Sequence, residues 1–139
     1  MSRFVLDASI VLTWCFPDED SGLARYVAEL FQLGNTAMVP SFWPHEVLNA
    51  LLAGEKRKRI SAALVQTFLS DLAALPIELE QVTSSNVFTR VQALSRTHAL
   101  TAYDAAYLDL AIEQRLPLAT LDDSLVKACE KGNVKLVRE

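Results

Sequence analysis

The hydrophobic and polar positions of this chain alternate in a way that predicts strands and helices in turn. The apolar run at residues 4–6 stops at Asp7, which is typical of a buried parallel strand. Short strands are also predicted at 37–39, 77–82, 117–120 and 134–137. Helical spacing of apolar residues predicts helices at 23–33, from 44, after 61, after Ser84 or Ser85, at 102–115, and from 122 or 123 to 131. This alternation predicts an α/β fold with a central, mainly parallel sheet.

Asp7 marks the expected carboxyl end of the first strand, where open α/β sheets bind their ligands. An aspartate at a strand-to-helix junction can also serve as the N-cap of the helix that follows. The pattern alone leaves both interpretations open.

Glu46 and Asp104 are two further candidates, each in the first turn of a predicted helix. Glu46 could simply interact with the helix dipole, but it shares its face with small residues that leave room for an ion or substrate: Asn49, Ala50 and Ala53. Asp104 shares its face with Leu108 and Ala111, whereas the polar face is predicted at Asp109 and Glu113. A carboxylate on an apolar face is costly unless something compensates it, which favours a functional role for Asp104.

Asp122 and Asp123 follow the strand predicted at 117–120. One of the two is expected to cap the next helix and the other to face a pocket. Carboxylates about 4 Å apart repel each other by roughly 4 kcal/mol at an effective dielectric of 20, so a cluster of them requires a cation. Oxygen ligands select Mg²⁺ or Mn²⁺ over zinc, and His45 and His98 have no partner at ligand spacing.

Composition adds a few limits to this interpretation. With 139 residues the chain fits a single domain, 1–139. A net charge of −4 argues against a general nucleic-acid coat protein, although bound cations would exempt a metal-dependent nuclease. No apolar run reaches the ~20 residues of a membrane span, and neither a secretory signal nor a CxxC cysteine spacing is present, so we expect a cytoplasmic protein.

Four segments in order give the chain a resemblance to the PIN-domain ribonucleases, and among them to VapC toxins: residues 5–9 (VLDAS), 44–51 (PHEVLNAL), 100–108 (LTAYDAAYL) and 118–122 (LATLD). The resemblance implies a three-layer α/β/α fold. It also implies that the catalytic and metal-binding residues are Asp7, Glu46, Asp104 and Asp122. Ser9 and Thr120 would hold these carboxylates by hydrogen bonds, with Asn49 as a further supporting residue.

The implied activity is Mg²⁺-dependent endoribonuclease cleavage, in which Mn²⁺ can substitute for Mg²⁺. The implied partners are an RNA substrate, a VapB-type antitoxin and a second copy of the chain. Arg57, on the same helical stripe as Glu46, is a candidate RNA contact. The alternative is a PIN-like module that binds RNA or protein without cutting.

Overall fold

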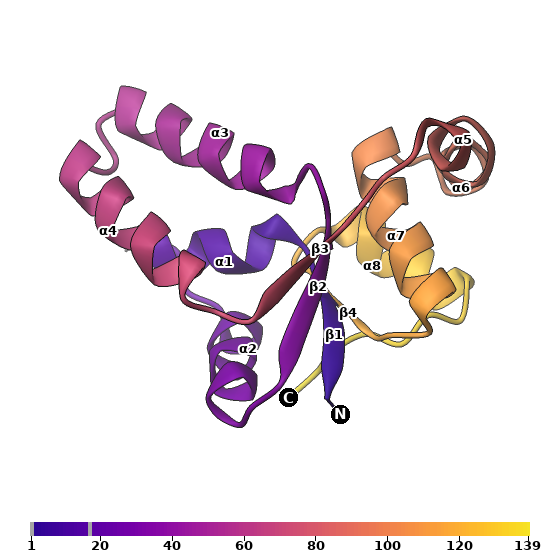
Figure 1. Ribbon diagram of the computed structural model, residues 1–139, viewed down its shortest axis with the longest axis horizontal. Coiled ribbons are helices and arrows are strands. Elements are labelled where there is room, and N and C mark those ends of the chain that lie inside the picture. The colour runs from indigo at the N-terminus through magenta and orange to yellow at the C-terminus, as the bar shows by residue number, and fades with distance from the viewer. Residues whose placement is uncertain (1, 17) are drawn as a thin grey trace.

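A computed structural model describes residues 2–16 and 18–139, and within these residues one four-stranded sheet lies between two groups of helices (Figure 1). The strands are β1 (Arg3–Leu6), β2 (Thr36–Pro40), β3 (Ile77–Glu80) and β4 (Leu118–Ala119). All the pairings are parallel, in the order β3-β2-β1-β4. The predicted α/β fold with a parallel sheet is therefore confirmed.

The helices divide between the two faces of the sheet (Figure 1). On one side lie α1 (Ala8–Cys15), α2 (Gly22–Gln32), α3 (Trp43–Lys56) and α4 (Ala62–Ala73). On the other lie α5 (Ser84–Asn86), the π-helix η1 (Val87–Val91), α6 (Gln92–His98), α7 (Ala102–Gln114) and α8 (Asp123–Lys131). This arrangement is the three-layer α/β/α fold expected from the resemblance.

The strand order reverses direction at β1. The chain moves outward from β1 to β2 and then β3, with α1–α4 in the connections, and then returns to place β4 on the other side of β1. In open parallel sheets, such a reversal opens a crevice at the carboxyl ends of the strands, and ligands bind there. The carboxyl ends of β1 and β4 lead directly to Asp7 and Thr120.

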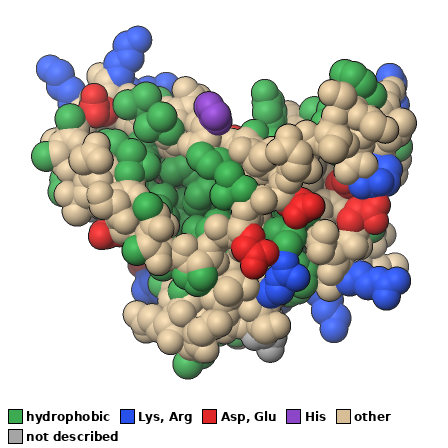
Figure 2. All heavy atoms as spheres, in the orientation of Figure 1, with side chains coloured by type: hydrophobic (Ala, Val, Ile, Leu, Met, Phe, Trp, Pro, Cys, Tyr) green, Lys and Arg blue, Asp and Glu red, His purple; other side chains and the backbone are tan. Residues whose placement is uncertain are grey.

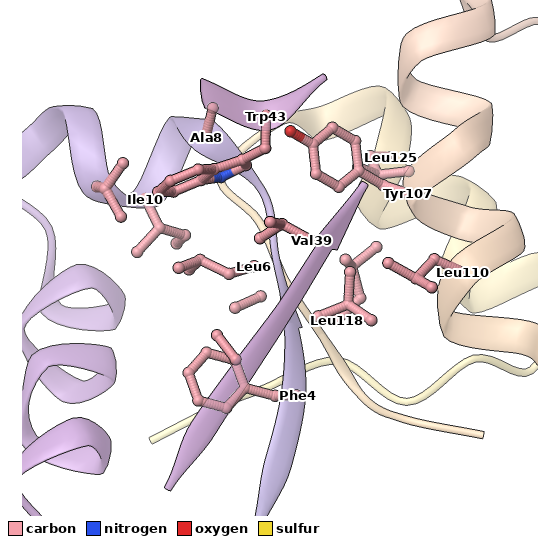
Figure 3. Close-up of a cluster of buried hydrophobic side chains, with 14 of the residues drawn as sticks. Phe4, Leu6, Ala8, Ile10, Val39, Trp43, Tyr107, Leu110, Leu118 and Leu125 are labelled. Carbon is pink, nitrogen blue, oxygen red and sulfur yellow. The ribbon is translucent and has the colours of Figure 1, made fainter. Parts of the chain in front are cut away.

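The core is built around β1, because a central parallel strand is covered on both faces. Phe4, Val5 and Leu6 have no exposed surface. Trp43 and Tyr107 reach this core from opposite sides of the sheet (Figure 3). The apolar run that identified the first strand is therefore fully buried.

Local sequence signals account for several helix boundaries. The helices α2, α4 and α7 each begin with an N-cap whose side-chain oxygen accepts the backbone N–H of the residue three positions later. These caps are Ser21, Ser61 and Thr101. After α2, Gly34 adopts a φ of +91°, which permits the turn into β2.

Three details differ from the sequence predictions. The strand expected at 134–137 is reduced to a single bridge between Leu118 and Leu136, because β4 itself is only two residues long. The helix expected from Ser84 or Ser85 is capped one residue earlier by Thr83 and contains the π-helical segment. Asp109, placed on the polar face of α7, is instead 7% exposed and paired with Arg90 at 3.0 Å. Arg90 makes that burial tolerable and links η1 to α7.

Apolar side chains remain exposed on α3 and α4. Leu48 and Leu52 are 39% and 48% exposed, and Leu64 is 59% exposed. Figure 2 shows hydrophobic side chains gathered over the region of these helices and α1. Within residues 2–16 and 18–139, no helix has the length and apolar character needed to cross a bilayer.

Candidate metal centre

Asp7 occupies the N-cap position of α1, but its side chain makes no capping hydrogen bond. Instead, its Oδ2 accepts hydrogen bonds from Ser9 Oγ and Thr120 Oγ1, both at 2.7 Å. The residue is only 6% exposed. The capping interpretation is therefore wrong for this carboxylate, which is held at the carboxyl edge of the sheet by two hydroxyl groups.

The directions of these bonds are set by the backbone of the loop after β4. Ser9 Oγ accepts the N–H of Leu121, and Thr120 Oγ1 accepts the N–H of Asp122, each at 3.0 Å. A hydroxyl has a single proton, so one that already accepts a backbone N–H is well placed to donate to the carboxylate. Both hydroxyls use Oδ2 of Asp7 and leave Oδ1 for other partners. Burial raises the pKa of Asp7, and the two hydroxyls oppose this rise.

Glu46 lies in the first turn of α3 and is half-buried. Its Oε1 accepts a 2.5 Å hydrogen bond from Tyr107 Oη on the other side of the sheet. Burial raises the pKa of Glu46, the Tyr107 hydroxyl lowers it, and the negative charges of Asp7 and Asp104 raise it further. The charges of two other candidate acids therefore act on the pKa of Glu46.

Asp104 lies in the first turn of α7, and its backbone N–H donates to Thr101 Oγ1 at 3.1 Å. Burial raises the pKa of Asp104 to about 6, with the charges of Asp122 and Asp7 as further causes. The predicted carboxylate is thus present, and the side-chain hydrogen bond of Thr101 only partly opposes the rise in its pKa.

Asp122 combines the two roles that the sequence analysis divided between Asp122 and Asp123. Its Oδ1 accepts the N–H of Leu125 at 2.9 Å and caps α8, while its negative charge also raises the pKa of Asp7 and Asp104. Asp123 is exposed in the first turn of the helix. The expectation that one aspartate caps the helix while the other faces the pocket is therefore wrong, because Asp122 both caps α8 and acts on the other acids.

The four carboxylates fit a hard divalent cation by their chemistry. They supply only oxygen donors, which Mg²⁺ and Mn²⁺ prefer, and negative charges within the group disfavour the ionised forms of Asp7, Glu46 and Asp104. Among the described residues, however, no three His, Cys, Asp or Glu side chains are already grouped as ligands of one ion. Binding a cation here would require these side chains to turn toward it.

Two aromatic residues at this site carried no role in the sequence analysis. Tyr107 donates to Glu46, and its ring packs edge-on against Phe42 with centroids 5.6 Å apart. Tyr107 lies three residues after Asp104 and therefore on the same face of α7. That spacing was the available signal, but a tyrosine within a buried helical run is ordinarily a core residue.

Two other candidates come from α3, the helix that carries Glu46. Asn49 is exposed on α3, and within the described residues its side chain has no hydrogen bond to any of the four carboxylates. Arg57 is the C-cap of α3, about 16 Å along the helix axis from Glu46 at 1.5 Å per residue. Its neighbour Arg59 is paired with Asp18 at 2.9 Å. The roles of Asn49 and Arg57 stay predictions.

Both the sequence and the fold of this chain are similar to those of known proteins. The PIN domain family matches residues 4–131, whereas no curated protein matches the chain. PAE2754 from Pyrobaculum aerophilum has a similar structure, with a TM-score of 0.71 at 18% identity, covering 91% of this chain and 79% of that one.

Two toxin–antitoxin structures are also similar. VapBC2 from Rickettsia felis, bound to a DNA fragment from its promoter, gives a TM-score of 0.60 at 18% identity and 97% coverage of both chains. A toxin–antitoxin complex from Klebsiella pneumoniae gives 0.58 at 18% identity and 86% coverage of both. At these identities the likeness establishes a shared fold.

Proposed function

Because this chain belongs to the PIN domain family, we propose that it is a metal-dependent endoribonuclease and the toxin of a toxin–antitoxin pair. The observation that carries the proposal is the Asp7 carboxylate, buried at the point where the strand order reverses and held by Ser9 and Thr120 instead of capping α1. A buried carboxylate whose pKa is raised, at the edge of a sheet where ligands bind, is typical of a functional site.

Asp7, Glu46, Asp104 and Asp122 would hold Mg²⁺, or Mn²⁺ in its place. When bound, the cation supplies Lewis-acid activation of water and neutralises charge on the scissile phosphate. Residues of the chain would orient the carboxylates that bind this cation. Ser9 and Thr120 hold Asp7 in one orientation, and the backbone N–H groups of Leu121 and Asp122 orient those two hydroxyls. Arg57 is a candidate contact for an RNA phosphate farther along α3.

The partner assignment rests on the surface and on the similar structures. The exposed leucines of α3 and α4 offer an apolar surface that suits a VapB-type antitoxin segment, and two of the similar structures are toxin–antitoxin complexes. We propose that the chain forms a homodimer, acts as a single domain, and cuts RNA in the cytoplasm, where its substrates are found.

The first test is cleavage of total cellular RNA by the purified, antitoxin-free chain. Cutting is expected with Mg²⁺ or Mn²⁺ and is lost in EDTA. Asp7→Asn and Asp104→Asn are each expected to lower the rate at least 100-fold, because each removes a negatively charged ligand that helps to hold the cation. Asp123→Asn is the matched control, since this neighbouring carboxylate is exposed, and its rate stays near that of the wild type.

The alternative is a non-catalytic module that binds RNA or a partner protein. It is favoured by the absence, among the described residues, of three side chains already grouped around one ion. RNA binding without metal-dependent cutting, unchanged in Asp7→Asn and Asp104→Asn, would support this alternative and contradict the nuclease.

A further inference from the structure

Aromatic side chains join the N-cap of α3 to the first two turns of α7. Tyr103 and Tyr107 lie one turn apart on α7, and both rings pack edge-on against Phe42, with centroids 5.2 Å and 5.6 Å away and interplanar angles of 79° and 89°. Phe42 precedes Glu46 by one turn of α3. The two helices therefore face each other as an outer pair, Tyr103 and Phe42, and an inner pair, Tyr107 and Glu46.

The two tyrosines differ in the environment of their hydroxyl groups. Tyr103 is 59% exposed, and within the described residues its hydroxyl makes no hydrogen bond to another side chain or to the backbone. Tyr107 is completely buried and donates to Glu46 Oε1 at 2.5 Å. Figure 3 shows the Tyr107 oxygen pointing away from α7 toward the side of Trp43, at the start of α3. The buried ring thus presents its hydroxyl at one defined place.

Glu46 needs such a contact if it is to stay near the other acids. Its side chain is half-buried, and the charges of Asp7 and Asp104 disfavour its ionised form at this place. A flexible glutamate under that repulsion would turn toward water, where its charge is better solvated. The hydrogen bond from Tyr107 opposes this movement and engages one carboxylate oxygen, leaving Oε2 for a ligand.

We propose that Tyr107 is a positioning residue, whose hydroxyl holds Glu46 at the acidic site so that Glu46 can bind the divalent cation. This inference rests on the proposed function, since it assumes that the four acids bind a metal. It adds a residue from the opposite helical layer, 61 positions away in the sequence, to the support of that site. Groups that orient metal ligands commonly contribute 10- to 100-fold in metal affinity.

The test compares Tyr107→Phe with Tyr103→Phe. Each substitution removes one hydroxyl and keeps a ring against Phe42, but only the first removes a bond to Glu46. The readout is Mn²⁺ affinity of the purified chain, measured by electron paramagnetic resonance. Tyr107→Phe is expected to weaken binding about 10-fold, and Tyr103→Phe to leave it unchanged. Thermal unfolding in EDTA checks that both variants are folded.

A second comparison separates positioning from packing. In a Glu46→Gln background, Tyr107→Phe is expected to cause no further loss of Mn²⁺ affinity, because the carboxylate that Tyr107 holds is already gone. If Tyr107→Phe fails to fold, Phe42→Leu loosens the Tyr107 ring without removing its hydroxyl, and a weaker Mn²⁺ affinity is again expected.

Equal Mn²⁺ affinity in the wild type and the folded Tyr107→Phe variant, or Phe42→Leu in its place, would overturn the inference and leave the proposed nuclease intact. An additional loss in the Glu46→Gln background would also overturn it, by assigning the effect to packing. Absence of Mn²⁺ binding and of RNA cutting in the wild type would overturn the proposed function, and this inference with it.

Discussion

The carboxylate of Asp104, a candidate metal ligand, is expected to lower the stability of the metal-free fold. Its pKa is about 6 in the folded chain, against an ordinary value of 3.8, because burial and the charges of Asp122 and Asp7 disfavour the carboxylate. Between these pH values the folded chain binds more protons than the unfolded chain. The free energy of unfolding of the metal-free protein therefore falls as pH rises from about 4 to about 6, and it stays reduced at pH 7.

Replacing Asp104 with Asn should remove this penalty. In EDTA at pH 7, Asp104→Asn is expected to raise the free energy of unfolding by about 1 kcal/mol, a value lowered for solvent screening because the side chain is only partly buried. It should also flatten the dependence of stability on pH between about 4 and 6. Urea denaturation at several pH values measures both effects.

Asp123→Asn provides the control at the same edge of the sheet. Asp123 is exposed in the first turn of α8, where its charge interacts favourably with the helix dipole, so its removal should lower stability by a few tenths of a kcal/mol. A loss of stability in Asp104→Asn at pH 7 would show that this carboxylate supports the metal-free fold, contrary to the expectation.

The candidate acids could be predicted from the sequence, but their support only in part. Asp7 was visible because a buried strand ends there, and Asp104 because it interrupts an apolar face. Tyr107 could not be identified from the sequence, because its hydrogen bond is to Glu46, which lies on another helix. The capping bond of Asp122 was foreseen as possible, but periodicity cannot say which of two adjacent aspartates makes it.

At the scale of elements, the contact between α1 and α3 depends on a residue without a side chain. A Cβ at Gly54 would lie 2.5 Å from Phe16 Cε1 and 2.7 Å from Cζ. Phe16 is itself buried, and the Arg59 guanidinium lies 4.3 Å from its ring centroid. The ring therefore has little room to move, and Gly54 allows α3 to approach it.

Gly54→Ala should consequently destabilise the fold, although alanine is the better helix former. We expect a loss of about 1–2 kcal/mol, because overpacking in a filled core outweighs the gain of about 1 kcal/mol in helix propensity. Urea denaturation of Gly54→Ala, Phe16→Leu and the double variant tests this. In the Phe16→Leu background the cost should shrink, and an undiminished cost would show that the ring is not its cause.

Elements were predicted well where their signals are local and poorly where they are not. The starts of the helices after 61 and at 102 were predicted correctly, because each cap, Ser61 or Thr101, is adjacent to its helix in the sequence. The π-helix was not foreseen, and neither was the pairing of its Arg90 with Asp109, a residue 19 positions away. The strand expected at 134–137 has a suitable pattern, but it is limited by the two-residue length of its neighbour β4.

At the scale of the whole molecule, alternation of strands and helices was enough to predict the parallel sheet. It was not enough to predict the strand order, because the same alternation is compatible with β4 beside β1 or at the other edge of the sheet, beside β3. The observed order brings Asp7 and Thr120 together although they are 113 positions apart. This placement came from the resemblance of the four segments, not from periodicity.

A divalent cation should stabilise the whole fold if it binds at these acids. At 100 times its dissociation constant, a ligand that binds only the folded state contributes about 2.7 kcal/mol. Addition of Mn²⁺ is therefore expected to raise the thermal midpoint of the wild type and to have little effect on Asp7→Asn. A shift of equal size in both proteins would mean that Mn²⁺ binds elsewhere.

The pairing of β1 with β4 also has a consequence for biosynthesis. A ribosome releases Asp7 long before Thr120 and Asp122, yet both of these later residues are needed to complete the hydrogen bonds around Asp7. Closing so long a loop is also slow compared with forming a helix. Under the proposed function, a nascent chain that has not reached residue 122 lacks these hydrogen bonds, and we expect it to cut no RNA.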